Sequence, residues 1–263
     1  MIVRKQANDE LVLIGQTDHS RLAGQLAAHW GNAQFATPDP YDSMVRAATF
    51  HDYGWLRYET NPLINPESGE PYSFLQVPLG SSQLASYQWS LDWMTSIDPY
   101  AGLIINMHRT GLWQRRYDTI THPTAYTPTE ITAEVRELID RNERWQEQAK
   151  AAWDPRQVDV NYRLMQVWDF LALYFCCDQP YEEYIEPVPT GYEEKAGVRM
   201  MLKPAGEKKV AFDPYPFDMR PCTVQLVTRR LPRTSYENVT EFQRAYFSAE
   251  IELCRFELGG LFS

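Results

Sequence analysis

The stretch NYRLMQVWDFLALYFCC, residues 161–177, is the part of the chain on which the fold depends. Apolar residues occur almost all round its helical projection, which is the pattern of a helix buried inside a domain. Its one acidic residue, Asp169, shares a helical face with Met165, Ala172 and Cys176 and is predicted to point into the interior. A buried carboxylate needs a cation or several hydrogen-bond donors, so this helix predicts a site within a helical core.

The chain before this helix has the patterns of further helices. One is expected to start near Thr17 or Asp18, either of which is a good N-cap, and to end at Gly31. A single helix, SMVRAATFHDYGWLRYE, is expected next, with Asp42 or Ser43 as its cap. The other helices are expected over residues of roughly 81–96, 99–116 with Pro99 as a first helical residue, and 157–177, with a long amphipathic helix opening at Pro128.

From Tyr181 onward the sequence changes to short strand-like runs, and the first 16 residues contain two more, IVRK and LVLIG. The expected fold class is α+β, a mostly helical core with an appended antiparallel β-sheet formed by the N-terminal hairpin and the C-terminal strands. We expect one compact unit, with a hairpin (1–16), a helical metal-binding core (17–180) and a C-terminal antiparallel portion (181–263). The C-terminal runs are VRMMLKP, KKVAFDPYPF, CTVQLVTRRLP and AEIELCRFEL.

Composition narrows the class of protein and its partners. With 25 Lys and Arg against 35 Asp and Glu, the 263 residues carry a formal net charge of −10, which argues against binding to nucleic acid. No stretch approaches the roughly 20 apolar residues of a membrane span, and no signal-peptide pattern is present. The four cysteines form no CxxC pair, which favours a reducing, cytoplasmic location. We expect a small-molecule substrate, and the oligomeric state is left open.

Four histidine and aspartate positions predict a metal site. They are His19 in QTDHSRL, the doublet His51-Asp52 in TFHDYGW, and Asp169. Each lies in or beside an apolar helical segment, where such side chains are costly unless they are paired or bind a metal. Taken singly, each has an ordinary structural explanation as a satisfied core residue. Together they are expected to hold one or two divalent transition-metal ions, of Mn, Fe, Co, Ni or Zn, through nitrogen and carboxylate ligands.

The order of these residues resembles the HD-domain superfamily of metal-dependent phosphohydrolases. Its signature is a His, a later His-Asp doublet and a distant Asp in a helical core, and here these positions are His19, His51, Asp52 and Asp169. The resemblance covers the helical portion and implies a metal-activated water. The segments QTDHSRLAGQLAAHWG, HDYGW, MHRTGL and DPYPF resemble more closely a bacterial family catalogued as a domain of unknown function, which brings no established activity.

The chain departs from the superfamily pattern beside the doublet. Many nucleotidase-type members carry a Glu three residues after the doublet, where this chain has Trp55. The nearest substitute is Glu59, seven residues after Asp52 and on the same face of a continuous helix. His108, in LIINMHRTGLW, resembles the additional histidines of two-metal members, which include cyclic-dinucleotide phosphodiesterases and di-iron oxygenases. His122 is a further candidate, although its Pro-containing loop favours a structural role.

These patterns give the expected site. The catalytic residues are expected to be His108, Glu59 and Asp18, with Arg109 and Trp55 contacting the substrate. The function expected from the resemblance is a metal-dependent hydrolase acting on a small, phosphorylated molecule. The alternatives are a di-iron oxygenase on the same scaffold and a catalytically degenerate domain that binds a ligand or a partner.

Overall fold

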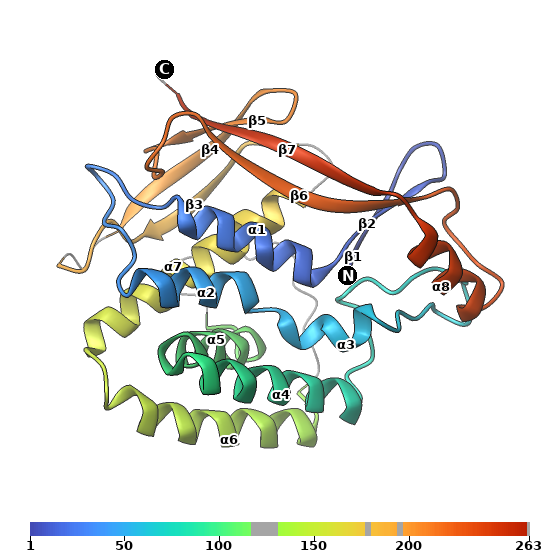
Figure 1. Cartoon of the computed structure of the whole chain (residues 1–263), viewed down its shortest axis with the longest axis horizontal. Coiled ribbons are helices and arrows are strands. Elements are labelled where there is room, and N and C mark those ends of the chain that lie inside the picture. Colours follow the sequence, from blue (N-terminus) through green and yellow to red (C-terminus); the bar gives the residue numbers. More distant parts are fainter. Residues whose placement is uncertain (117–130, 177–179, 194–196, 262–263) are drawn as a thin grey trace.

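The structure, a computed structural model, combines a curled β-sheet with a layer of helices packed beneath it (Figure 1). It describes residues 1–116, 131–176, 180–193 and 197–261. The described strands form one seven-stranded sheet in the order β1-β2-β6-β7-β5-β4-β3. The strands are β1 (Ile2–Lys5), β2 (Leu11–Ile14), β3 (Glu183–Val188), β4 (Val198–Gly206), β5 (Lys209–Asp213), β6 (Cys222–Leu231) and β7 (Ile251–Gly260).

The sheet takes its strands from both ends of the chain, so the α+β prediction is confirmed. The N-terminal hairpin joins the C-terminal strands through β2 and β6, where Leu11 pairs with Leu231. Among the described strands, all neighbouring pairs are antiparallel except β5 with β7, which the sequence did not predict. That pair is parallel because β7 returns between β6 and β5, after the helix α8 (Val239–Ser248).

The helices lie in tiers under the sheet. The first helix, α1, contacts β6 above it and α2 and α7 beside it, while α5 contacts α2, α4, α6 and α7. In Figure 1, α4 and α6 lie farthest from the sheet. The helical elements before α8 are α1 (Gln16–Ala28), α2 (Tyr41–Phe50), the short η1 (Tyr53–Trp55), α3 (Leu56–Glu59), α4 (Ser81–Ile97), α5 (Pro99–Trp113), α6 (Ala133–Lys150) and α7 (Pro155–Phe175).

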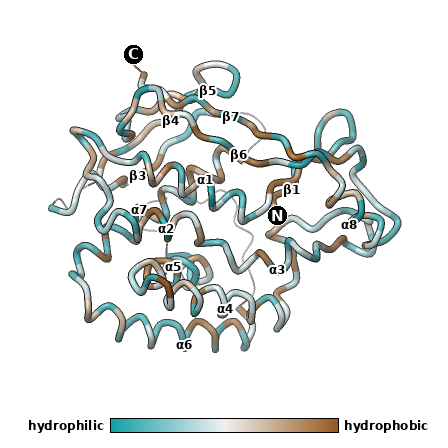
Figure 2. The backbone as a smooth tube through the Cα atoms, in the orientation of Figure 1, coloured by the Kyte–Doolittle hydropathy of each residue, from teal (hydrophilic) through white to brown (hydrophobic). Residues whose placement is uncertain are grey.

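Helix α7 is the buried helix that its sequence predicts. It contains 14 buried residues out of 21, and its N-cap Asp154 accepts hydrogen bonds from the backbone N–H groups of Arg156 and Gln157. Helix α5 begins in the same way, because Asp98 caps it and Pro99 occupies the first position. Much of α5 is hydrophobic in Figure 2. No helix among the described residues is long and apolar enough to cross a membrane.

Three details of the helix prediction are wrong. Helix α1 begins at Gln16, after Gly15, and so neither Thr17 nor Asp18 is its N-cap. Helix α2 follows Pro40 and starts before the expected cap at Asp42. The single helix expected over SMVRAATFHDYGWLRYE ends at Phe50 and continues only as η1 and α3. The Pro128 start of the long helix falls outside the described residues, which show α6 from Ala133 with Thr132 as its cap.

A glycine allows α1 and α2 to approach each other closely. A Cβ atom at Gly24 would lie 2.1 Å from Thr49 Oγ1 and 3.0 Å from the Thr49 Cα. No larger side chain fits there without a backbone shift. The close contact brings the start of α1 beside the end of α2, where His19 and His51 lie.

Candidate metal centre

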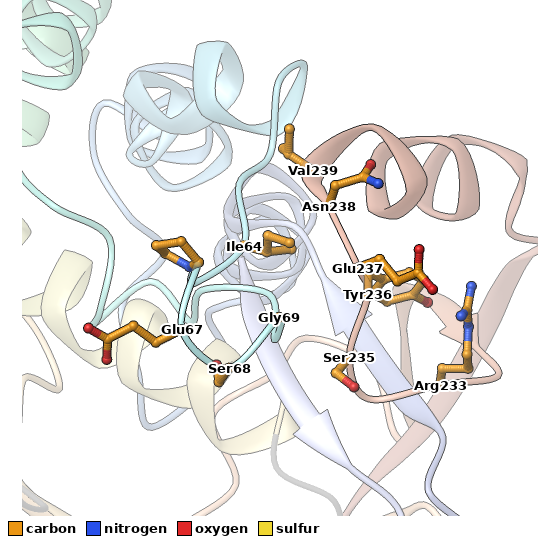
Figure 3. Close-up of a pocket in the computed structure, with 11 residues that line it drawn as sticks. Ile64, Glu67, Ser68, Gly69, Arg233, Ser235, Tyr236, Glu237, Asn238 and Val239 are labelled. Atoms are coloured by element: carbon orange, nitrogen blue, oxygen red, sulfur yellow. The ribbon is translucent and has the colours of Figure 1, made fainter.

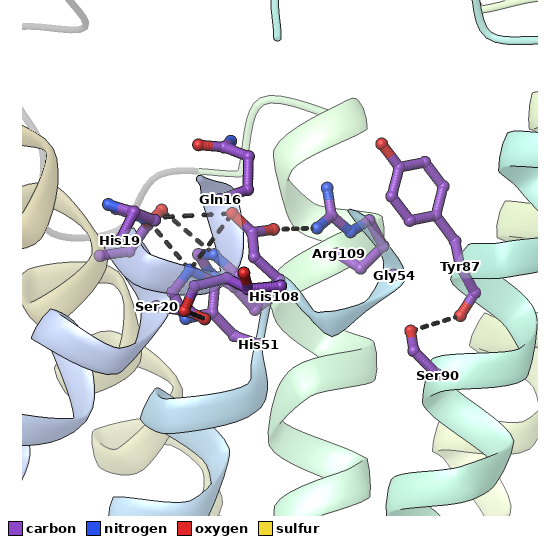
Figure 4. A network of polar contacts seen from close by, with 12 residues as sticks. Gln16, His19, Ser20, His51, Gly54, Tyr87, Ser90, His108 and Arg109 are labelled. Carbon is purple, nitrogen blue, oxygen red and sulfur yellow. Dashed lines mark hydrogen bonds and ion pairs between the residues drawn. The ribbon is translucent and has the colours of Figure 1, made fainter. Parts of the chain in front are cut away.

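Four elements bring the predicted metal ligands together. His19 lies in the first turn of α1, His51 caps the C-terminus of α2, Asp52 follows it, and Asp169 lies on α7. Figure 4 shows His19, His51 and His108 gathered in one polar network. The side chains of all five residues of this metal cluster, His19, His51, Asp52, His108 and Asp169, are at least nine-tenths shielded from solvent.

Asp169 is the centre of the metal cluster. Its Oδ1 atom lies 2.8 Å from His19 Nε2 and 3.3 Å from His51 Nε2, and its Oδ2 atom lies 3.2 Å from His108 Nε2. Asp52 Oδ2 lies 3.6 Å from His51 Nε2 and 4.0 Å from His19 Nε2. Ligand atoms of His19, His51 and Asp169 all lie within 4.8 Å of one another. The oxygens of the two carboxylates thus lie between 2.8 and 4.0 Å from the imidazole nitrogens that face them.

The imidazole nitrogens test whether a metal fits this space. His51 Nδ1 lies 2.8 Å from the Ala48 carbonyl oxygen, which fixes the ring and directs Nε2 at the carboxylates. His51 Nε2 and His108 Nε2 face the Asp169 carboxylate at 3.3 and 3.2 Å without hydrogen-bond geometry, and His108 Nδ1 has no partner among the described residues. Buried polar atoms are almost always partnered, and imidazole nitrogens beside carboxylates are the donor set of transition metals. The residues present therefore fit a metal ion.

The pKa shifts in the metal cluster also indicate that its two carboxylates need a positive charge beside them. Burial alone would raise the pKa of Asp169, but the imidazoles of His108, His19 and His51 beside its oxygens hold it well below its usual 3.8. For His51, burial favours the neutral ring, yet the charges of Asp52 and Asp169 raise the pKa above 6.5. Burial lowers the pKa of His108. Two ionised carboxylates are thus stable here when protons on imidazoles, or a metal ion in their place, supply the opposite charge.

Arg109 lies beside the metal cluster as the partner of Asp52. Its guanidinium donates to Asp52 Oδ1 and lies over the ring of Tyr87, with Cζ 4.5 Å from the ring centroid. Asp52 therefore presents one oxygen to the imidazoles and the other to a buried cation. The sequence predicted a substrate contact for Arg109, and any such contact must use the N–H groups that do not bind Asp52.

Three predicted site residues make their described contacts with residues outside the metal cluster. Glu59 accepts hydrogen bonds from the first residues of α1, because the chain breaks its helix after Phe50 and the shared face with Asp52 is lost. Asp18 pairs with Arg21 at 2.8 Å instead of orienting His19. Trp55 packs its ring against Tyr58 and Tyr87, at centroid distances of 5.8 and 5.7 Å, in the apolar core.

Two residues near the metal cluster were not predicted as part of it. Gln16 is only 3% exposed and its Oε1 has no partner among the described residues, and Figure 4 shows it beside the network. Cys176 Sγ lies 4.0 Å from His19 Nδ1. The position of Cys176 could have been inferred from the sequence, because Cys176 shares a helical face with Asp169. No feature of the sequence indicated the position of Gln16. His122 lies outside the described residues.

A separate pocket lies between residues 64–69 and 233–239, shown in Figure 3. Its volume is about 750 Å³, and no member of the metal cluster lines it. The one cation on its wall, Arg233, is paired with Glu241 at 2.6 Å. The pocket is therefore not part of the metal cluster.

The fold and the metal cluster define an α+β protein with a candidate buried metal centre. The chain belongs to the family described as protein of unknown function DUF3891, whose model matches residues 1–233. The match includes every residue of the metal cluster and ends before α8 and β7. Searches among curated proteins and among solved structures found no match.

Proposed function

We propose that this protein is a metal-dependent hydrolase acting on a small, phosphorylated molecule. The observation that carries the proposal is the set of buried imidazole nitrogens of His51 and His108, which lie 3.2 to 3.6 Å from the carboxylates of Asp52 and Asp169 without a hydrogen bond of good geometry. His19, His51, Asp52 and Asp169 are the proposed ligands of the first ion. A bound divalent metal lowers the pKa of its water towards neutrality and so supplies a nucleophile.

The charges of the cluster favour an anionic substrate. With neutral imidazoles, the two carboxylates and Arg109 sum to −1, and a divalent ion brings the total to +1. A buried site with a surplus positive charge stabilises a phosphate group and the negative charge that develops on it during hydrolysis. Asp52 holds Arg109 at this site, where its remaining N–H groups are proposed to contact the substrate.

His108 is proposed to bind the substrate or a second ion. Asp169 presents Oδ1 to His19 and His51 but Oδ2 to His108, an arrangement that suits a carboxylate bridging two ions. This observation also favours the second candidate function, a di-iron oxygenase on the same scaffold. The two candidates differ in the metal that they need and in their dependence on oxygen.

The cysteines and the net charge support the proposed setting. No disulfide joins Cys176, Cys222 and Cys254 within the described residues, which favours a reducing compartment such as the cytoplasm. The net charge of −10 favours a small molecule over nucleic acid as the partner.

The test combines metal analysis with an activity assay. Purified protein is stripped with a chelator, reloaded separately with Zn, Mn, Co, Ni or Fe, and assayed with p-nitrophenyl phosphate and bis-p-nitrophenyl phosphate. We expect bound metal and phosphate-ester hydrolysis in the wild type, and loss of both in Asp169→Ala. The matched control is Asp159→Ala, which removes an exposed carboxylate of the same helix paired with Arg163 at 3.1 Å.

Three outcomes contradict the hydrolase proposal. Iron with an oxygen-dependent reaction and no ester hydrolysis supports the oxygenase instead. Bound metal without turnover of either ester supports a ligand-binding domain. A wild-type protein that binds none of the metals rejects the metal centre itself.

A further inference from the structure

The N-terminus of α1 has no cap of its own. Its N-cap residue is Gly15, in an extended conformation with φ −65° and ψ 147°, and it provides no side chain. The first backbone N–H groups of a helix have no partner inside the helix and need acceptors from elsewhere. These groups belong to the turn that carries His19.

The carboxylate of Glu59 provides the missing acceptors. Glu59 is 8% exposed and accepts hydrogen bonds from the backbone N–H groups of Gln16 and Thr17, the second at 3.3 Å. Its Oε2 atom also accepts from the Thr17 hydroxyl at 2.5 Å. A negative charge at this end of a helix is further stabilised by the helix dipole.

Glu59 also lies on the segment that carries two of the proposed ligands. It ends α3, which follows η1 and the doublet of His51 and Asp52. This short segment therefore meets α1 twice, at His19 through the metal cluster and at Thr17 through Glu59. We propose that Glu59 is a positioning residue of the metal centre, which fixes the first turn of α1 against the turn of His51 and Asp52. This inference rests on the proposed metal centre.

The close packing around Gly15 also places the Glu59 carboxylate against the N-terminus of α1. A Cβ atom at Gly15 would lie 3.1 and 3.2 Å from the two carboxylate oxygens of Glu59 and 3.1 Å from Asp18 Oδ2. These distances are shorter than ordinary van der Waals contact, so an added side chain requires the Glu59 carboxylate or that of Asp18 to shift by a few tenths of an ångström. The backbone of Gly15 suits any residue, so Gly15→Ala disturbs this contact without backbone strain.

A matched control separates positioning from ordinary capping. Asn238 caps α8 by accepting a hydrogen bond from the Glu241 N–H at 2.9 Å, and α8 carries no residue of the metal cluster. Glu59→Ala and Asn238→Ala each remove one cap, and both are expected to lower the melting temperature. Only the first is expected to change metal affinity.

The experiment measures the Kd for Zn²⁺ or Mn²⁺ by competition calorimetry on stripped protein. We expect Glu59→Ala to raise the Kd about 10-fold, as is typical when a residue that orients a ligand is lost. Glu59→Gln is expected to give a smaller increase, because an amide keeps one acceptor oxygen but turns an N–H₂ group towards the other donors. Gly15→Ala should raise the Kd with Glu59 intact, and Asn238→Ala should leave it unchanged.

The outcomes distinguish this inference from the proposed function. Metal binding by the wild type with an equal Kd in Glu59→Ala overturns the positioning role alone. An increase of the same size in Asn238→Ala also overturns it, because the effect then follows general stability. If Glu59→Ala does not fold, an unchanged Kd in both Glu59→Gln and Gly15→Ala overturns it. A wild type that binds no metal overturns both proposals.

Discussion

Helix α5 carries two buried polar clusters on different faces, and they differ in how well they are satisfied. One is the metal cluster, which α5 reaches through His108. The other is an amide network towards α6, in which Asn106 donates to Asn142 Oδ1 at 2.8 Å and Gln146 donates to Asn106 Oδ1 at 2.7 Å. Gln146 also lies 3.0 Å from the Thr110 hydroxyl oxygen.

The amide network is neutral and its members are hydrogen-bonded, whereas nitrogens of His51 and His108 lie beside charged carboxylates without forming a hydrogen bond among the described residues. Burial is thus common to both clusters and does not identify a site. Buried polar atoms that form no hydrogen bond beside buried charges are the better indication of a site, because each such atom costs free energy unless a ligand or an ion binds to it. By this criterion the network is structural, and we propose the metal cluster as the functional site.

The largest expected effect is the loss of metal binding in Asp169→Ala. Asp169 contacts all three imidazoles of the metal cluster, so its removal should weaken metal binding by more than the roughly 10- to 100-fold cost of losing an outer-shell partner. Metal should raise the melting temperature of the wild type, because it binds the folded state, but not that of the variant. Thermal melts with and without a chelator measure this, and a retained metal-dependent shift contradicts it.

The second prediction concerns His108→Ala. Its Nε2 atom lies 3.2 Å from Asp169 Oδ2 but forms no hydrogen bond of good geometry, so we expect most of the stability and the first metal to remain while ester hydrolysis is abolished. Activity and metal content per chain are measured together. His29→Ala is the control, since His29 lies at the surface beside Asp218 at 3.1 Å. Unfolding of the His108 variant alone would place the residue in the core.

The third prediction concerns the amide network, whose disruption should lower stability without changing metal affinity. Asn142→Ala leaves buried partners on Asn106 unsatisfied and should lower the free energy of unfolding by about 1–3 kcal/mol. The metal Kd should not change, because the network lies on another face of α5. Urea unfolding and calorimetry on the same sample check both parts. A fall in affinity as large as that of Glu59→Ala would show that the two clusters are coupled.

The smallest expected effect is the pH dependence of the metal-free protein. The pKa of Asp169 is below its usual 3.8 in the folded state, so its contribution to stability is present above that value and is lost as the pH falls through the folded-state pKa. The pKa of His51 is raised above 6.5, so its contribution is present below 6.5 and is lost as the pH rises through the folded-state value. The pKa of His108 is lowered, so its effect opposes that of His51 near pH 6.5, and the clear expectation is on the acid side: urea unfolding should show stability falling below about pH 4, and Asp169→Asn should flatten this fall. Equal acid sensitivity in that variant would contradict this assignment.

The sequence predicted the α+β class and the meeting of the four ligand positions because those signals are local. An apolar helix with a single carboxylate, such as the helix of Asp169, predicts a buried polar site from its own sequence, whatever the elements that pack against it. The strands after Tyr181 are short and bounded by turns, which is also visible in the sequence.

The details that the sequence did not predict depend on distant contacts. The helix break after Phe50 is held by packing of Phe50 and Tyr53 against Trp93 on α4, at ring centroid distances of 5.5 and 5.1 Å. The cap of α1 comes from Glu59, 44 positions after Gly15 along the chain, so no local capping pattern reveals it. Strand β3 was missed because Pro187 interrupts it, which is tolerated at an edge of a sheet.

The pairing of Leu11 with Leu231 has a consequence for the order in which the protein forms during synthesis. All five residues of the metal cluster are synthesised before the first residue of β6, Cys222. During that interval the N-terminal hairpin lacks the strand that it pairs with in the folded protein. Until β6 arrives, β2 exposes an apolar strand edge, which is open to pairing with other chains. A chain truncated in this interval would contain every residue of the metal cluster but would lack β6 and β7, and so the edge of β2 would stay open.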